Sequence, residues 1–65
     1  MKLNLYRLQR IRKKKNYTQE EIAKALGFKS RSAYSKRENG LATIGADELA
    51  TIAELFDYEM EYFFD

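Results

Sequence analysis

The chain is 65 residues long with a net charge of +2, and it contains no cysteine, no histidine and no proline. This composition excludes disulfide bridges, metal sites built on thiolate or imidazole ligands, and nucleophilic catalysis of the Cys–His or Ser–His–Asp kind. Residues 1–40 carry all 12 Lys and Arg with three acids, whereas residues 41–65 carry seven acids and no base, so the amino-terminal part suits a polyanionic partner.

An amphipathic helix is predicted near the amino terminus. Leu5, Leu8 and Ile11 recur at helical spacing and form one apolar stripe, while the other faces carry basic residues. The lysines at 13–15 suit the negative carboxyl end of a helix. Asn16 is the expected left-handed residue after this helix, because asparagine tolerates a positive φ better than most residues.

A second, shorter helix is predicted to start after Thr18. Thr18 and Glu21 have the spacing of a capping box, in which each side chain accepts a hydrogen bond from the other residue's backbone amide. Gly27 ends the helix, which has only about two turns and therefore depends on tertiary partners. Its inner face is formed by Ile22, Ala23 and Leu26.

The segment GFKSRSAYSKRENG, residues 27–40, contains a predicted third helix. Ser30 is a suitable N-cap, and Gly40 provides the stop. Ala33 and Tyr34 are expected to face inward. Two short helices joined by a brief glycine-containing turn form the helix-turn-helix pattern.

The carboxyl-terminal part is expected to close the fold. A fourth helix is predicted from the spacing of Leu49, Ile52, Ala53 and Phe56. A last short apolar segment contains Tyr58, Met60, Phe63 and Phe64. We therefore predict an all-α fold, a compact bundle of about five short helices containing a helix-turn-helix, as a single domain of residues 1–65.

The sequence carries no sign of catalysis or membrane insertion. The start, MKLNLYRLQR, has no continuous apolar run of signal-peptide length, so we expect a cytoplasmic protein with no membrane partner. We find no nucleophile–base pair, metal-ligand cluster or glycine-rich phosphate loop. We therefore expect a protein that is not an enzyme and that has no cofactor, no metal and no small-molecule ligand.

Taken together, these segments resemble a known family, the phage-repressor (Cro and lambda-repressor-like, XRE-type) helix-turn-helix domains. The resemblance covers about residues 3–64 and rests on the joint order and spacing of Leu8, Ile11, Arg12, Thr18, Gln19, Ile22, Ala23, Leu26, Gly27, Glu38, Gly40, Ile52, Ala53, Phe63 and Phe64. It implies a transcriptional regulator, in the simplest case a repressor, that binds double-stranded DNA by inserting a recognition helix, about residues 30–39, into the major groove.

The resemblance also implies roles for individual side chains. Arg31, Ser32 and Lys36 are expected to meet base edges in the major groove. Arginine suits guanine O6 and N7, lysine can approach the same acceptors and serine is permissive, so we expect at least one G·C pair per half-site. Arg12 and Glu38 match the family's ion pair, which links the first helix to the end of the recognition helix.

Further residues are expected to contact phosphates or other parts of the DNA. Gln19 matches the family's phosphate-contacting glutamine, at a helix N-terminus that already presents free amides to an anion. Because the loop after the recognition helix has no cation, we also expect phosphate contacts from the amides near Asn39 and Gly40 and from the basic run 10–15. The other candidates are Lys13, Lys14, Lys29, Ser30, Ser35 and Asn39.

Two positions depart from the family pattern. The interval from Gly27 to Gly40 is one residue longer than in the commonest version, with Lys29 as the natural insertion. Arg37 stands where relatives usually carry an aliphatic residue, so its stem must lie over the core or its charge must turn to DNA.

The aromatic carboxyl-terminal end contains more large apolar groups than so small a core can bury. An exposed apolar patch usually marks an interface, so we predict that Tyr62 and Phe64 contribute to a symmetric homodimer. A dimer places two recognition helices about 34 Å apart, one turn of DNA, and implies a roughly palindromic operator. The acidic half is expected to face away from the DNA.

Two other functions remain open from the sequence. Residues 1–15 form a basic amphipathic segment that could bind anionic lipid or an acidic groove. The acidic aromatic end, residues 56–65, could instead dock on a protein partner, as in a protein-interaction or antitoxin-type module.

Overall fold

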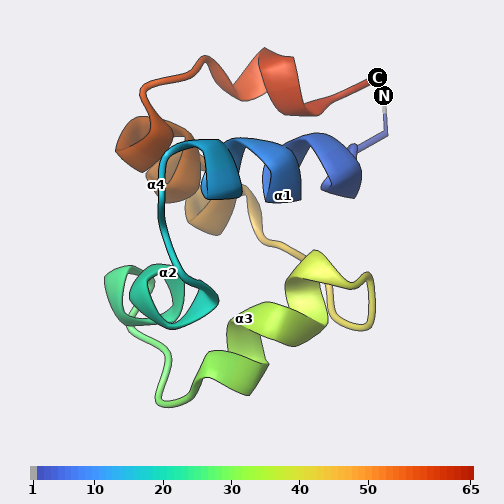
Figure 1. Cartoon of the computed structure of the whole chain (residues 1–65). Helices are drawn as coiled ribbons and strands as arrows, with labels where there is room; N and C mark the ends of the chain where they lie inside the picture. Colours follow the sequence, from blue (N-terminus) through green and yellow to red (C-terminus); the bar gives the residue numbers. More distant parts are fainter. Residues whose placement is uncertain (1) are drawn as a thin grey trace.

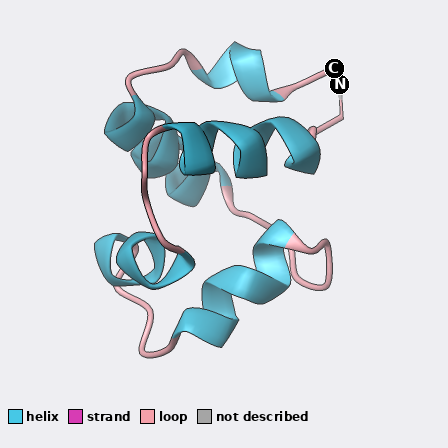
Figure 2. Ribbon diagram, viewed as in Figure 1, coloured by secondary structure: helices cyan, strands magenta, loops and turns pink. Residues whose placement is uncertain are grey.

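The computed structural model describes residues 2–65. It contains four α-helices and a short 3-10 helix (Figures 1 and 2). The elements are α1 (Leu5–Lys14), α2 (Gln19–Ala25), α3 (Arg31–Glu38), α4 (Ala46–Phe56) and η1 (Met60–Phe63). Within residues 2–65 the β-type pairing is limited to an isolated antiparallel bridge between Leu3 and Phe64. The predicted all-α bundle of about five short helices is confirmed.

The helix ends follow the local rules that the sequence indicates. The chain turns left-handed at Asn16, with a φ of 65°, and at Gly27 and Gly40, with φ values of 79° and 81°. The Thr18 amide donates to Glu21 Oε1 at 2.8 Å and the Glu21 amide donates to Thr18 Oγ1 at 3.1 Å, so the capping box is formed. Ser30 occupies the N-cap of α3, but its side chain makes no capping hydrogen bond.

The core lies between the four α-helices and the carboxyl-terminal segment. Tyr34 is fully buried from α3 as predicted, whereas Ala33 is only half-buried. The Phe56 ring lies 5.6 Å from the Tyr17 ring and 6.4 Å from the Phe63 ring, centroid to centroid. These contacts join the α1–α2 loop, α4 and η1. The largest fully buried side chains are Tyr34, Phe56, Phe63, Leu8, Ile11, Ile22 and Ile52.

The carboxyl-terminal segment runs back along α1, so that the two ends of the chain lie together (Figure 1). Phe63 is fully buried, and its carbonyl accepts a hydrogen bond from the Asn4 amide at 2.6 Å. Arg7 Nη1 donates to the carbonyls of Tyr62 and Phe64 at 3.2 and 3.1 Å. The last residues therefore complete the core and are fastened to α1 through their backbone.

A buried ion pair ties α1 to the end of α3. Arg12 Nε donates to Glu38 Oε2 at 2.9 Å and Arg12 Nη2 donates to Glu38 Oε1 at 3.1 Å, so the predicted pair is present and bidentate. The exposed fractions are only 7% for Arg12 and 5% for Glu38. Arg12 Nη1 also donates to the Tyr17 carbonyl at 2.7 Å, which fastens the loop before α2 to the same guanidinium.

The surroundings of Glu38 keep it charged. Burial by itself raises the pKa of Glu38, but the hydrogen bonds from Arg12 and Gln19 outweigh burial and hold this pKa below its usual value. The Tyr34 hydroxyl is buried without a regular hydrogen-bond partner. Burial, followed by the charge of the nearby Glu38 carboxylate, raises the pKa of Tyr34. The tyrosine is therefore neutral and the carboxylate ionised near pH 7.

Replacing Glu38 by Gln keeps the shape of the side chain but leaves the Arg12 guanidinium buried without a counter-charge. We expect the free energy of unfolding at pH 7, measured by urea denaturation, to fall by roughly 3–5 kcal/mol. Replacing both Arg12 and Glu38 by Met should recover most of this loss, because no lone charge is then buried. A Glu38→Gln protein as stable as the parent would contradict the account of the pair.

The same pair predicts how stability depends on acid. Because the pKa of Glu38 is lower in the folded than in the unfolded chain, its contribution is complete above the unfolded carboxyl pKa and is lost as pH falls through the folded pKa. In urea titrations below pH 5, Glu38→Gln should therefore lose stability less steeply than the parent protein. Glu20→Gln, at an exposed carboxyl on α2, serves as the control and should keep the parent's acid dependence.

Candidate nucleic-acid interface

The helix-turn-helix consists of α2, α3 and the turn of residues 26–30 between them. α3 lies at the side of the molecule opposite to the carboxyl-terminal segment, as seen at the bottom of Figure 1. The side chains of Tyr34 and Glu38 anchor it to the core, since both are buried. Three residues of the helix, Arg31, Ser32 and Lys36, are exposed to solvent.

The predicted base-reading residues all lie on that surface. Arg31, Ser32 and Lys36 are exposed, and they belong to the same eight-residue helix. The Ser30 and Ser32 hydroxyls are 3.0 Å apart. Because Ser30 does not cap the helix with its side chain, the first N–H groups of α3 are left for solvent or for an anion. The amino-terminal end of α3 is thus cationic, open and rich in donors.

Arg31 is held by Gln19 at the start of α2. Arg31 Nη1 donates to Gln19 Oε1 at 2.9 Å, and Gln19 Nε2 donates to Glu38 Oε1 at 3.0 Å. Gln19 is half-buried, between the exposed guanidinium and the buried carboxylate. Four side chains, including Arg12, are therefore linked from α1 to the tip of α3. The family resemblance implied a phosphate contact for Gln19, and no feature of the sequence indicated this link.

The other residues predicted to contact DNA lie in the turn before α3 and toward the end of this helix. Lys29 is exposed in the turn before α3. Asn39 Nδ2 lies 3.4 Å from Ser35 Oγ at the opposite end of the helix. The Asn39 amide donates to the Ser35 carbonyl at 2.9 Å and the Gly40 amide donates to the Arg37 carbonyl at 3.2 Å. The expectation that these two amides hold phosphate was wrong, because they close the end of α3 instead.

Two members of the basic run on α1 contact the carboxyl-terminal segment. Arg10 Nη2 donates to the Tyr62 hydroxyl at 3.3 Å, and Lys15 Nζ lies 5.6 Å from the centre of the Tyr58 ring. Lys13 and Lys14 are both exposed. Phosphate contacts from the run 10–15 therefore stay a prediction, and two of its cations also pack on the carboxyl-terminal segment.

Arg37 does not turn toward the exposed face of α3. Its Nε donates to Glu48 Oε1 at 3.1 Å and its Nη1 donates to the Ala33 carbonyl at 2.7 Å. Its guanidinium carbon lies 4.3 Å from the centre of the Phe28 ring, in the geometry of a cation–π contact. Arg37 therefore joins the turn, α3 and the start of α4, a role that an aliphatic residue cannot fill.

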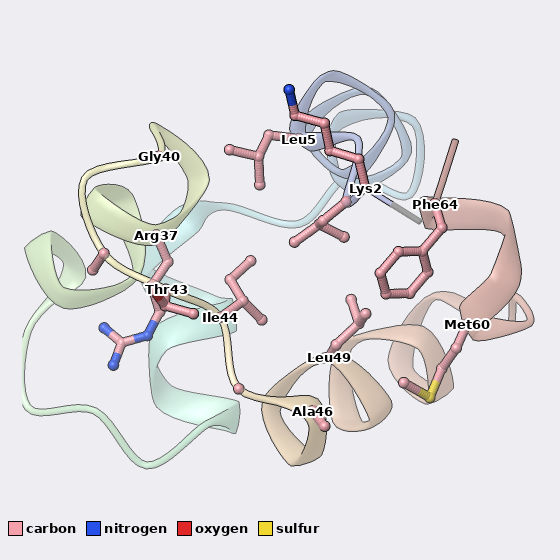
Figure 3. A pocket seen from close by; sticks show the side chains of 13 residues that line it. Lys2, Leu5, Arg37, Gly40, Thr43, Ile44, Ala46, Leu49, Met60 and Phe64 are labelled. Atoms are coloured by element: carbon pink, nitrogen blue, oxygen red, sulfur yellow. The ribbon is translucent and has the colours of Figure 1, made fainter.

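An apolar groove of about 460 Å³ lies beside the start of α4 (Figure 3). Leu5, Ile44, Leu49 and Phe64 point into it, with Lys2 and Arg37 among the lining residues. The groove was not predicted, because its wall combines the first residues, the loop after α3 and the last residues.

Two large apolar side chains in residues 2–65 are strongly exposed, Tyr6 at 70% and Leu41 at 78%. Leu41 lies in the loop after α3, between Gly40 and Ala42, which both line the groove. The connector after Gly40 carries no charge, and this feature of the sequence could have indicated an exposed apolar surface.

The two residues predicted to form a dimer interface lie close together but differ in surroundings. Tyr62 is half-buried, with Arg10 on its hydroxyl and the Arg7 guanidinium 5.7 Å from the ring centre. Phe64 is also half-buried, but its ring faces the groove (Figure 3). Tyr62 is thus engaged by two arginines, whereas the Phe64 ring forms part of the groove wall.

The described part of the chain shows neither a metal-binding cluster of side chains nor a helix that could span a membrane. No cluster of acidic side chains in residues 2–65 has a geometry that could hold a metal ion. No helix in the same range is both long and apolar enough to cross a membrane.

Comparisons with known proteins also indicate a helix-turn-helix. Residues 8–63 match a protein-family model described as helix-turn-helix. The HTH-type transcriptional regulator AnsR of Bacillus subtilis (strain 168) is 40% identical over 55 residues, which are 85% of this chain and 47% of that protein. The chain thus spans about half the length of this curated relative, and no solved structure gives a significant match. The chain belongs to the helix-turn-helix family, in the XRE-type group that its sequence resembles.

Proposed function

We propose that the protein is a sequence-specific, double-stranded DNA-binding regulator of transcription that acts in the cytoplasm, most simply as a phage-type repressor that occludes a promoter. The observation that carries this proposal is the exposed face of α3, where Arg31 and Lys36 project from a helix anchored by buried Tyr34 and Glu38. A rigid helix with cationic side chains on its free side suits the major groove of B-form DNA.

The side chains of α3 favour recognition of guanine. Arg31 has a planar fork of donors that matches O6 and N7 of guanine, and Lys36 can approach the same acceptors. Ser32 is small and can either donate or accept, so it adapts to either base pair. We assign base reading to these three residues, and we expect at least one G·C pair in each half-site.

Phosphate contacts flank the base-reading helix. At the start of α2, one Gln19 Nε2 hydrogen is used by Glu38, which leaves the second hydrogen for a phosphate oxygen. Lys29 and Ser30 lie beside the open amides of α3, and Ser35 and Asn39 lie toward its other end. On α1 we assign the contacts to Lys13 and Lys14, which are both exposed.

A symmetric homodimer on a palindromic operator is the second part of the proposal. Phe64 and the apolar groove beside it, together with exposed Leu41, provide an apolar surface close to the end of α3. An isologous contact there joins two copies through the same patch and spaces their recognition helices by about 34 Å.

The two rival functions account for less of the structure. A membrane-bound α1 would need its apolar stripe, but Leu8 and Ile11 are buried in the core. A protein-interaction or antitoxin-type role of the carboxyl-terminal end would need free aromatic side chains, but Phe63 is buried and Tyr62 is held by Arg10. Neither rival uses the exposed cations of α3.

Salt dependence tests whether the partner is DNA. If about six phosphates are contacted, the logarithm of the association constant for duplex DNA should fall with the logarithm of salt concentration with a slope near −5. Fluorescence anisotropy with a labelled duplex measures this slope. A flat salt response, or binding to anionic vesicles but not to duplex, would contradict the proposal.

The exposed lysines of α1 test the phosphate contacts. Lys13→Ala and Lys14→Ala should each weaken binding to every duplex alike and make the salt slope less negative by about 1, because one phosphate contact is lost. The same anisotropy titrations measure this change. A substitution that leaves the slope unchanged would exclude that lysine from the phosphate contacts.

Substitution of Arg31 tests base reading directly. Arg31→Ala should relax the preference for one base pair and cost about 1–3 kcal/mol of discrimination there, because a bidentate contact to guanine is lost. Competition between duplexes that differ at single positions measures this change. A uniform loss of affinity with unchanged base preference would instead place Arg31 on a phosphate.

The dimer proposal is tested by sedimentation. The parent protein should sediment as a dimer on a duplex with two half-sites, and Phe64→Ser should shift it toward the monomer because apolar contact area is lost. Tyr6→Ser, which removes an exposed aromatic ring away from the groove, should leave the dimer unchanged. A parent protein that is monomeric both free and on DNA would exclude the dimer.

A further inference from the structure

Arg37 joins three parts of the molecule through one guanidinium. Its Nε donates to Glu48 Oε1 at the start of α4 at 3.1 Å, and its Nη1 donates to the Ala33 carbonyl within α3 at 2.7 Å. Its guanidinium carbon also lies 4.3 Å from the centre of the Phe28 ring, in the turn before α3. Glu48 Oε1 in turn accepts from the Gly45 amide at 3.0 Å. The turn is thereby connected both to α3 and to the start of α4.

These contacts restrain the guanidinium of Arg37. Hydrogen bonds from two of its nitrogens fix the plane of the group, and a cation that faces an aromatic ring is attracted to it. The side chains of Arg37 and Glu48 are only 23% and 22% exposed, so their attraction is less screened than that of a pair on the open surface. The opposite charge of Glu48 also weakens the pull of Arg37 on an anion. Arg37 is therefore suited to hold the Phe28 ring and poorly suited to bind DNA itself.

The restrained ring belongs to the residue directly before Lys29. The Phe28 amide donates to the Ala23 carbonyl at 2.9 Å, which fixes the backbone before Lys29 to α2. After Lys29, the Ser30 carbonyl accepts a hydrogen bond of 3.3 Å from the first turn of α3. Lys29 itself is exposed and takes part in neither hydrogen bond. The placement of its side chain therefore depends on its two neighbours, one of which Arg37 restrains.

The order of this turn affects how well its cation can bind a phosphate. Lysine meets a phosphate as a point charge, so the position of the ammonium group determines the contact. A flexible segment that becomes ordered only on binding loses part of its interaction free energy to that ordering. A turn that is already ordered in the free protein avoids this loss.

We propose that Arg37 is a positioning residue for DNA binding, which holds Phe28 and the turn so that Lys29 is presented to a phosphate beside the amino-terminal end of α3. This inference rests on the proposed DNA-binding function, in which Lys29 contacts phosphate, and it names the side chains that order this contact. Arg37 acts through the Phe28 ring and not through its own charge. The two residues at which the chain departs from the family pattern, Lys29 and Arg37, thus act together.

A double-substitution cycle between Arg37 and Lys29 tests this coupling. Arg37→Met keeps an unbranched stem and removes the guanidinium, and Lys29→Ala removes the cation of the turn. Lys24→Ala, at an exposed lysine on α2, is the matched control. Fluorescence anisotropy at one low salt concentration measures the affinity of each variant for a duplex selected by the parent protein. Thermal unfolding checks that each variant is folded.

Lys29→Ala in the parent background should weaken binding by roughly threefold to tenfold, as expected for the loss of one charged contact. In the Arg37→Met background the same substitution should cost less than about twofold, because the ammonium group is no longer held in place. Phe28→Leu, which removes the ring but no charge, should reduce the effect of Lys29→Ala in the same way. The effect of Lys24→Ala should not depend on residue 37.

Arg37→Lys separates positioning from a direct contact. Lysine keeps the positive charge but has no planar fork that can stack on Phe28 while it bonds to Glu48 and Ala33. Arg37→Lys should therefore reduce the effect of Lys29→Ala as strongly as Arg37→Met does.

Amide hydrogen exchange in the free protein provides a readout without DNA. The Phe28 amide should exchange faster in Arg37→Met by roughly threefold or more, because the turn opens more often. The Lys15 amide at the end of α1, which donates to the Ile11 carbonyl at 2.9 Å, should exchange as in the parent protein. Equal acceleration at both amides would indicate a general loss of stability and would contradict a specific role in the turn.

Other outcomes overturn the inference in distinguishable ways. Losses from Arg37→Met and Lys29→Ala that multiply would mean that the two residues act independently. Full affinity in Arg37→Lys, together with a loss in Arg37→Met, would mean that Arg37 binds phosphate through its charge. No effect of Lys29→Ala in the parent background would exclude Lys29 from the phosphate contacts and end the inference. If the parent protein binds no duplex at low salt, the proposed function itself fails, whereas exchange of the Phe28 amide still shows whether Arg37 holds the turn.

Discussion

The buried ion pair between Arg12 and Glu38 is the interaction on which the rest of the structure depends. It joins α1 to the end of α3, and Arg12 also holds the loop before α2 through the Tyr17 carbonyl. Two charges in so small a core are costly unless each is fully paired, and here the geometry is bidentate. The pair therefore specifies how α3 is oriented, and it does so at little net gain in stability. Through Gln19, the same pair reaches the surface that we propose reads DNA.

The basic part of the sequence and its acidic end do not form two separate faces of the structure. The acidic end packs back on α1, where Arg7 and Arg10 contact the Tyr62 and Phe64 backbone and the Tyr62 hydroxyl. These cations therefore help to fasten the last segment. Lys29, Arg31 and Lys36, in α3 and its preceding turn, remain exposed, and their charge favours a polyanion.

Local signals in the sequence predicted the fold well. The capping box at Thr18, the left-handed residue Asn16 and the glycine stop at Gly40 each follow from the chemistry of neighbouring residues, and all three are present. The ion pair followed from a family resemblance. The partners of Arg37 could not be predicted, because the turn that carries Phe28 and the helix that carries Glu48 meet at Arg37 only in the folded chain. The groove and the Gln19 link depend in the same way on tertiary placement rather than on spacing along the chain.

The most direct test of the central claim is selection of duplexes from a random pool by the parent protein, followed by sequencing of the bound fraction. The account predicts enrichment of one motif with two inverted half-sites, about one helical turn apart, each containing at least one G·C pair at a fixed position. A bound fraction with no enriched motif, although the protein binds DNA, would contradict the claim that α3 reads sequence.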